Sequence, residues 1–397
     1  MRGSSMPDIG VFNERVVLEV IRSSPEGLSQ SEVGRLSGLS RQAVSLISRR
    51  LVERGLIEAA GTRTRGRGKP HTVLRVVPRA LLTAGVHLDP AGITVVIGDM
   101  LARVVTKRSL DPATDSPETD IDRIVSALDE MRGEIDGVPL LGIGVASPGG
   151  LDIAHGIVVD PPWLPGWRNV PVVDLLEAAT GRPVILDKDT DAALTAERWA
   201  GHAAPGEDTL YIYVGAGIGS SAAAGGRVHR GATTQAGEIG HLPTGLDGPR
   251  CVCGMLACLN LYTDAQGMLE RATAAGLAGA GAGRSVAASL TDLVDLARVD
   301  PRARDVLDMH AVALGEALRT LIAVHDPHRL IIGGPYWRLL EELEMPIVRD
   351  HALRERGELG GVTISSSSLG DDVGAIGAAC LVLERELAPG PGAHQRP

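Results

Sequence analysis

The sequence predicts an α/β protein with a winged helix-turn-helix at its N-terminus, and three observations support this fold class. Residues 1–80 hold 14 Lys and Arg against 7 Asp and Glu, a net charge of +7, whereas the remainder carries −17. The same 80 residues contain signals for short helices followed by two strands. From about residue 81, glycine-rich strands alternate with helices, as in α/β domains. We therefore expect domains at 1–80 and 81–388 and a disordered tail at 389–397.

The composition is that of a soluble globular protein large enough for two or three domains, with 397 residues, 44% hydrophobic and 22% charged. No apolar run approaches the ~18 residues of a membrane span, and no secretory leader opens the sequence, so we expect a cytoplasmic protein without a membrane partner. A basic head attracts phosphate backbones while an acidic body resists them, so DNA contacts should be confined to the head.

Three helices are expected in the head. Apolar residues at helical spacing predict the first at 13–23. Ser29 and Glu32 form a capping-box pattern that opens the second. Ser40 can cap the third, whose apolar positions Val44, Ile47 and Leu51 face a core.

The opposite face of the third helix has the side chains expected of a DNA-reading helix: Arg41, Gln42, Ser45 and Arg49. Arg recognises guanine, Gln recognises adenine, and Ser reaches either a base or a phosphate. We predict that this helix enters a major groove.

Two strands around residues 57–77 are joined by a basic, glycine-rich tip at 61–70, the pattern of a wing. Its cations are Arg63, Arg65, Arg67 and Lys69. Glycine lets the backbone approach DNA, and the arginines can enter a narrow minor groove. The alternative is a solvated loop beside helices that only pack together. The wing, the capping box and the charge step together favour DNA binding.

The body is expected to alternate strands and helices, with an Ala/Gly-rich stretch at 273–287 as a loop or loosely packed helix. The expected strands are 83–89, 93–99, 141–146, 184–187, 210–214 and 330–332, and the expected helices are 119–133, 189–200, 304–324 and 372–387.

One imidazole and three thiols are closely spaced in the body: His241, Cys251, Cys253 and Cys258. Gly254 allows a tight turn between them. Three thiolates and one imidazole complete a tetrahedral set with no open position, which predicts a structural Zn²⁺ site. Two glycine-rich segments that follow strands, 214–219 and 333–334, could approach phosphates or simply form turns.

Taken in order, these features resemble the ROK (repressor, open reading frame, kinase) family over residues 81–388. The matching segments are Ser-Pro-Gly-Gly at 147–150, Pro-Gly-Trp at 165–167, Leu-Asp-Lys-Asp-Thr-Asp at 186–191, and the stretch 230–258 with its Gly-Glu-Ile-Gly-His and cysteine motifs. The resemblance implies a two-lobed, actin-like ATPase/sugar-kinase fold behind the winged head.

The resemblance also implies a sugar pocket. Asp189 occupies the position of the catalytic base of the family's kinases, here expected to be vestigial, and Glu238 and His241 match residues that contact sugar hydroxyls. The full set of implied ligand contacts is Gly149, Gly150, Lys188, Asp189, Glu238, His241 and Asn260.

Departures from the family's kinases predict that phosphoryl transfer is lost. Where those kinases have Asp-x-Gly-Gly-Thr-Lys, this chain has His-Leu-Asp-Pro-Ala-Gly at 87–92. In the second phosphate loop Ala216 replaces Thr, and Ser220 and Ser221 replace glycine. Phosphoryl transfer depends on positioning and on stabilising phosphate charge, so loss of both loops should abolish it.

Two pocket positions also change charge: Lys188 replaces an asparagine and Asn260 replaces a glutamate. Lys188 could recognise an acidic or phosphorylated sugar. Alternatively, it could pair with Asp187, Asp189 or Asp191 in a pocket that binds nothing.

The resemblance favours a transcription factor, most often a repressor, that responds to a sugar or sugar-derived effector. It would bind a palindromic DNA operator as a homodimer or homotetramer. Two alternatives remain: an active ATP-dependent sugar kinase with a DNA-binding head, and a regulator governed by a partner protein without a ligand.

Overall fold

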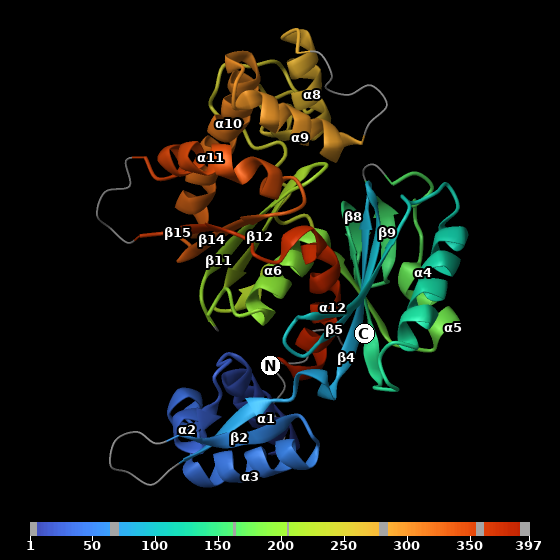
Figure 1. Cartoon of the computed structure of the whole chain (residues 1–397), viewed down its shortest axis with the longest axis vertical. Helices are drawn as coiled ribbons and strands as arrows, with labels where there is room; N and C mark the ends of the chain where they lie inside the picture. The colour runs from blue at the N-terminus through green and yellow to red at the C-terminus, as the bar shows by residue number, and fades with distance from the viewer. Residues whose placement is uncertain are drawn as a thin grey trace.

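The computed structural model describes residues 6–63, 71–161, 164–204, 206–277, 285–354 and 361–389. A small head lies at one end of a body with two lobes, each built around its own sheet (Figure 1). The mixed α/β architecture and the winged head are as predicted from the sequence. No helix in the described part of the chain is both long enough and apolar enough to cross a membrane.

The head consists of three helices and a three-stranded sheet of order β1-β3-β2. Its elements are α1 (Met6–Arg22), β1 (Leu28–Ser29), α2 (Gln30–Ser37), α3 (Arg41–Glu53), β2 (Ile57–Arg63) and β3 (His71–Val76). The capping box of Ser29 and Glu32 forms as expected, and Ser40 accepts a hydrogen bond from Ala43 N at 3.2 Å. The first helix begins seven residues earlier than its apolar pattern predicted.

The first lobe contains a five-stranded mixed sheet of order β10-β7-β4-β5-β6. Its strands are β4 (Leu82–Asp89), β5 (Gly92–Asp99), β6 (Val104–Leu110), β7 (Leu140–Ser147) and β10 (Val184–Lys188). Helices α4 (Pro117–Arg132) and α5 (Val172–Thr180) cover one face, and a small hairpin of β8 (Gly150–Asp152) and β9 (Ile157–Asp160) extends beyond β7 (Figure 1). The parallel strands β4, β7 and β10 end together, so their last residues meet at one edge.

The second lobe repeats the plan with a sheet of order β13-β12-β11-β14-β15. Its strands are β11 (Thr209–Val214), β12 (Ile218–Ala224), β13 (Arg227–Val228), β14 (Arg329–Gly333) and β15 (Thr363–Ser366). Its helices are α7 (Asn260–Thr263), α8 (Ala265–Ala274), α9 (Val286–Ala297), α10 (Pro301–His325) and α11 (Trp337–Ala352). Helix α11 contacts β14 and β15, whereas α8 and α9 pack against α10 at the end of the lobe away from the sheet (Figure 1).

Two buried helices, α6 (Asp189–Trp199) and α12 (Val373–Leu387), lie between the two sheets (Figure 1). They cross very closely: a Cβ atom at Gly377 would lie 2.1 Å from the Ala192 carbonyl oxygen, so only glycine fits there. The first residue of α6 lies at the strand ends of the first lobe, and its last residue lies against the head. This helix therefore connects the interior of the body with the head.

Two arginines of α1 contact the body: Arg15 donates to the Ala388 carbonyl oxygen at 3.3 Å, and Arg22 lies at the end of the helix against α6. The Arg22 guanidinium lies 4.1 Å from the ring centroid of Trp199, donates to the Trp199 carbonyl oxygen, and pairs with Glu19 at 2.7 Å. The Trp199 indole nitrogen donates in turn to Glu384 of α12 at 2.7 Å. One polar cluster thus joins α1, α6 and α12.

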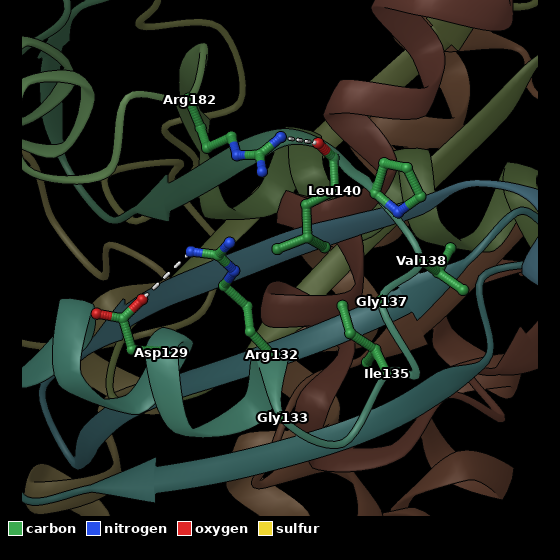
Figure 2. A pocket seen from close by; sticks show the side chains of 9 residues that line it. Asp129, Arg132, Gly133, Ile135, Gly137, Val138, Leu140 and Arg182 are labelled. Atoms are coloured by element: carbon green, nitrogen blue, oxygen red, sulfur yellow. Dashed lines mark hydrogen bonds and ion pairs between the residues drawn. The ribbon is translucent and has the colours of Figure 1, made fainter.

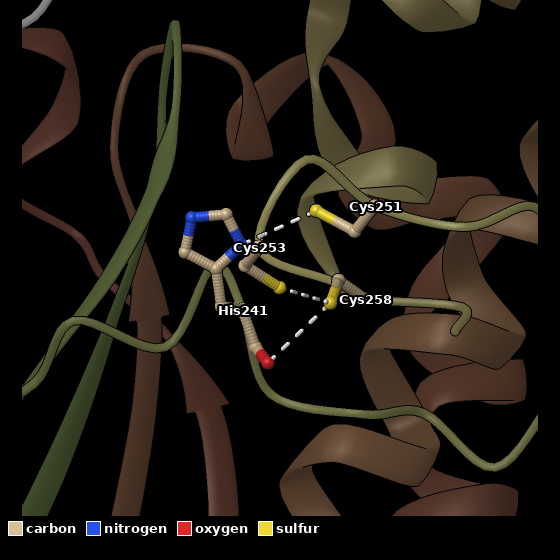
Figure 3. Close-up of side chains that lie close together, drawn as sticks. All are labelled: His241, Cys251, Cys253 and Cys258. Carbon is tan, nitrogen blue, oxygen red and sulfur yellow. Dashed lines mark hydrogen bonds between the residues drawn. The ribbon is translucent and has the colours of Figure 1, made fainter. Parts of the chain in front are cut away.

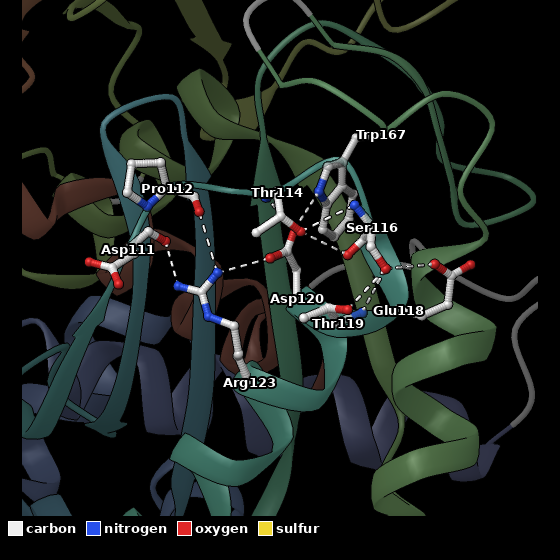
Figure 4. Close-up of polar contacts among 9 residues, drawn as sticks. All are labelled: Asp111, Pro112, Thr114, Ser116, Glu118, Thr119, Asp120, Arg123 and Trp167. Atoms are coloured by element: carbon white, nitrogen blue, oxygen red, sulfur yellow. Dashed lines mark hydrogen bonds and ion pairs between the residues drawn. The ribbon is translucent and has the colours of Figure 1, made fainter.

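The Pro-Gly-Trp segment of the first lobe has a structural role (Figure 4). The buried carboxylate of Asp120 accepts hydrogen bonds from the Trp167 indole at 3.1 Å and from Thr114 N at 2.8 Å, and it pairs with Arg123 at 2.9 Å. The chain after Trp167 pairs with β9 through Val170 and Val158. Asp120 therefore braces the hairpin that begins at Gly150.

The strands and helices predicted for the body are all present, with strand boundaries shifted by at most one residue. Two of the elements that were not predicted have features that disfavour their type of secondary structure. Strand β6 is an exposed edge strand containing Lys107 and Arg108, and α11 continues through Pro346. In the Ala/Gly-rich stretch, α8 ends at Ala274 and α9 begins at Val286. Residues 390–397 of the predicted tail lie outside the described residues.

Candidate DNA-binding face, cysteine cluster and interlobe cleft

The predicted DNA-reading face of α3 is free. Val44, Ile47 and Leu51 are buried as expected, while Arg41, Gln42 and Arg49 are exposed and Ser45 is half-buried. Within the described part of the chain, no hydrogen bond or ion pair engages these four polar side chains. Their donors remain available to a nucleic acid.

The wing is only partly described. Strands β2 and β3 form the predicted antiparallel hairpin, with a bulge between Ala59 and Thr62. Arg63, at the base of the wing, donates to the Glu26 carbonyl oxygen at 3.0 Å, so part of its guanidinium is used within the head. Arg65, Arg67 and Lys69 lie outside the described residues.

The four predicted metal ligands come together (Figure 3). The imidazole of His241 and the thiols of Cys251, Cys253 and Cys258 place their ligand atoms within 4.8 Å of one another. His241 Nδ1 lies 3.4 Å from Cys251 Sγ, and Cys253 Sγ lies 3.5 Å from Cys258 Sγ. Gly254 takes a φ of +93° in the turn between the cysteines, as predicted.

These residues fit a tetrahedral zinc ion. Zn–S bonds of ~2.3 Å give a tetrahedron whose edges are about 3.8 Å, close to the spacings of the cluster. Hydrogen bonds, first from the Cys253 backbone, lower the pKa of Cys251 to about 7, whereas burial and the neighbouring thiols raise the pKa of Cys258 to about 12. Three adjacent thiolates repel one another unless a cation binds between them.

A cleft between the lobes opens at the strand ends from which α6 starts. Its lining residues come from both lobes and are Asp89, Pro90, Pro148, Gly149, Lys188, Asp189, Thr190, Tyr213, Ala216, Gly217, Ile218, Gly219 and Glu238. Its empty volume, including the part open to solvent, is about 560 Å³. This location, at the strand ends and between two lobes, suits a small molecule.

Lys188 is already paired, but not with the aspartates considered from the sequence. It is 3% exposed, forms a 2.6 Å ion pair with Glu238, and donates to the Ala236 carbonyl oxygen at 3.2 Å. The loop that carries Glu238 is held against β12, because a Cβ at Gly237 would lie 1.9 Å from the Ser220 carbonyl oxygen. Close packing therefore fixes the partner of the lysine.

The neighbouring aspartates form a separate buried network. Asp187 pairs with Arg230 at 2.6 Å, and Asp191 accepts a hydrogen bond from Ser221 at 2.5 Å. Burial, followed by repulsion from Asp187, raises the pKa of Asp191 to about 7. Burial also raises the pKa of Asp189, against the opposing effects of His87 and Lys188.

The predicted ligand residues divide between two places. Gly149, Lys188, Asp189 and Glu238 line the cleft. Gly150 begins the adjacent strand β8, whereas His241 belongs to the cysteine cluster and Asn260 Oδ1 lies 3.9 Å from Cys251 Sγ.

Among the lining residues that were not proposed as ligand contacts from the sequence, those with polar side chains are Asp89, Thr190 and Tyr213. Asp89 belongs to the segment 87–92, which was interpreted from the sequence only as a phosphate loop lacking the residues of the family's kinases. Thr190 follows Asp189, and Tyr213 precedes the glycine-rich segment 214–219. The two residues are distant in sequence, and the fold brings both to the cleft.

A second hollow lies at the opposite end of β7 from the cleft (Figure 2). Its two arginines are engaged with their own lobe: Arg182 donates to the Leu140 carbonyl oxygen at 2.9 Å, and Arg132 lies 3.5 Å from Asp129. This hollow collects none of the predicted site residues.

Comparison with known proteins agrees with both parts of the molecule. The ROK family profile matches residues 83–385, and that of the MarR family matches residues 12–68. A xylose repressor of Bacillus spizizenii is 23% identical over 380 residues, covering 94% of this chain and 96% of that protein. A glucokinase of Thermotoga maritima is 29% identical over 313 residues, covering 76% of this chain and 97% of that protein.

Among solved structures, a ROK family transcriptional regulator described as a homologue of the Escherichia coli MLC protein superposes with a TM-score of 0.73 at 20% identity. The match covers 95% of this chain and 97% of that chain. A winged head joined to a two-lobed sugar-kinase fold defines the class, a DNA-binding transcriptional regulator. The chain belongs to the ROK family.

Proposed function

We propose that this ROK protein regulates transcription by binding an operator through α3 and the wing, and that its interlobe cleft senses a sugar-derived effector instead of phosphorylating it. The unengaged polar face of α3 carries this proposal. Its relatives include proteins named as a xylose repressor and a DNA-binding transcriptional repressor, which favours repression. We expect a palindromic operator bound by a symmetric dimer or tetramer, because two winged heads related by symmetry would occupy two half-sites.

Loss of kinase activity is part of the proposal, because ROK relatives also include glucokinases. The phosphate loop of those enzymes is represented here by Asp89, Pro90 and Ala91, and the Asp89 carboxylate faces the cleft. A carboxylate repels phosphate, and proline supplies no N–H to bind it. We expect no turnover of Mg-ATP with sugars.

Zinc is proposed as a structural ion held by His241, Cys251, Cys253 and Cys258. It would supply positive charge that stabilises three thiolates and would lock the loop following Glu238. The ion would thereby fix one wall of the cleft without taking part in chemistry.

Helix α6 is the proposed connection between effector and operator. Asp189 at its start lines the cleft, and Trp199 at its end stacks with Arg22 of the head. A ligand that favours one position of α6 would favour one position of the head, and in a symmetric dimer would alter the separation of two heads.

DNA binding tests the proposal directly. Selection from a random duplex library with the full chain is expected to enrich a two-fold symmetric site, and Arg41→Ala with Gln42→Ala should weaken binding to it by at least tenfold. Arg132→Ala, an exposed arginine of the body, is the matched control and should bind as the wild type does. Absence of any enriched duplex would refute the proposed function.

A further inference from the structure

The charges of the cleft do not cancel. Three carboxylates line it, those of Asp89, Asp189 and Glu238, against the single cation of Lys188. The 2.6 Å contact between Lys188 and Glu238 joins that cation to one carboxylate. Two carboxylates, Asp89 and Asp189, remain.

Neither remaining carboxylate lies within 4 Å of a cationic side chain among the described residues, and His87 and Lys188 act on Asp189 only at longer range. One oxygen of Asp89 accepts from Ala91 N at 2.8 Å, and one oxygen of Asp189 accepts from Thr190 N at 2.7 Å. The second oxygen of each is free to accept from a ligand.

Two buried hydroxyls beside these carboxylates also lack partners. Tyr213 is 5% exposed and Thr190 is 2% exposed; both line the cleft, and neither hydroxyl makes a hydrogen bond within the described structure. A desolvated hydroxyl without a partner costs about 1–3 kcal/mol, so a ligand that satisfies both would offset that cost.

The carboxylates of Asp89 and Asp189 act electrostatically on the neighbouring phenols. Burial and then the charges of Asp89 and Asp189 raise the pKa of Tyr213, and Asp89 similarly adds to the effect of burial on Tyr336. A negative site between low-dielectric walls attracts cations and repels anions.

We propose that the ligand carries a protonated amine, which binds between Asp89 and Asp189 and donates a hydrogen bond to the Tyr213 or Thr190 hydroxyl. This inference rests on the proposed function, in which the cleft holds a small sugar-derived effector. It replaces an acidic ligand as the preferred chemistry, because Lys188 is neutralised by Glu238.

Matched sugars test the charge of the amine. Thermal shift and calorimetry of the full chain at pH 6.5 would compare glucosamine, galactosamine and mannosamine with glucose, galactose and mannose. N-acetylglucosamine retains the nitrogen without its charge, and glucose 6-phosphate and glucuronate represent acidic ligands. At least one amino sugar should bind tenfold or more tightly than both its parent hexose and, for glucosamine, its N-acetyl form.

A variant pair tests the position. Asp89→Asn should lower the preference for the amine about tenfold, while Asp122→Asn, an exposed aspartate of α4, should preserve it. Equal binding of neutral sugars, tighter binding of acidic sugars, or no binding by any of them would overturn the proposed amine. The selection of duplex DNA would still decide the regulator function separately.

Discussion

The cysteine cluster and the interlobe cleft are neighbouring polar sites that are built in opposite ways. The cluster takes its four side chains from the segment between His241 and Cys258, and their possible ligand atoms lie within 4.8 Å of one another. The cleft assembles residues from Asp89 to Glu238 across both lobes, and part of its charge is cancelled internally by Lys188 and Glu238. The cluster is therefore expected to contribute mainly to stability, and the cleft mainly to recognition.

The largest expected effect follows removal of the proposed zinc ion. Chelation, or Cys258→Ser, should lower the free energy of unfolding by about 5 kcal/mol or more, because structural zinc contributes apparent binding energies of roughly 10–16 kcal/mol. Metal content and chemical denaturation would measure this effect. Cys380→Ala, a buried cysteine outside the cluster, should leave the metal content unchanged. If the metal-free chain were as stable as the metal-bound chain, the cluster would not contribute to stability and the prediction would be wrong.

The free energy of unfolding should depend on pH through Asp191, which is buried in the first turn of α6. The pKa of Asp191 is raised from 3.8 to about 7, so the folded state favours its protonated form. The resulting stability is fully present below pH 3.8 and is lost as the pH rises to about 7. Asp191→Asn should flatten this decline, as measured by urea unfolding between pH 5 and 8. Asp129→Asn, on the surface, should retain the wild-type slope; identical slopes in all three proteins would contradict the prediction.

The ion pair in the cleft should respond asymmetrically to substitution. Glu238→Gln leaves the buried Lys188 ammonium without its anion and should cost about 2 kcal/mol, reduced by the exposure of Glu238. Lys188→Met removes the buried charge and should change stability by less than about 1 kcal/mol. Thermal and denaturant unfolding would separate the two variants. Equal losses would show that the pair does not behave as a buried lysine neutralised by a half-exposed glutamate.

A small effect on stability is expected at the junction between head and body. Arg22→Ala removes the stacking on Trp199 and should cost about 1 kcal/mol. Its effect on effector response should be larger, because the proposed route from the cleft through α6 ends at Trp199, beside Arg22. Operator affinity with and without bound sugar would reveal this, with Arg54→Ala in the same head as the control. A normal response in Arg22→Ala would exclude this route.

The difference between the two sites also explains what the sequence could predict. The four side chains of the cluster come together as predicted, because one short segment contains all of them, and the capping box and apolar face of α3 were similarly local. The alternative in which Lys188 pairs with an aspartate was wrong about the partner. It considered Asp187, Asp189 and Asp191 because they are nearer in sequence than Glu238. Adjacent residues at the end of β10 and in the first turn of α6 point in different directions. Asp187 therefore pairs with Arg230, and Asp191 accepts a hydrogen bond from Ser221.

The acidic residues of the cleft show the same limit. From the sequence, Asp89 was interpreted as part of a phosphate loop that is no longer functional. The replacements at Lys188 and Asn260 were interpreted as making the pocket more positive. In the structure Asn260 lies beside the cysteine cluster, and Asp89 joins Asp189 at the cleft. Charge in a pocket depends on which side chains share a wall, and the relevant residues lie in different lobes.

The central claim, that the cleft controls the head, is tested most directly by measuring operator affinity during titration with sugars. Fluorescence anisotropy of a selected duplex should show a change of roughly 5–150-fold when a ligand fills the cleft, the usual range of coupling between sites. The same ligand should give no turnover with Mg-ATP. Operator affinity that is unchanged at saturating ligand, together with sustained phosphorylation of that sugar, would contradict the account.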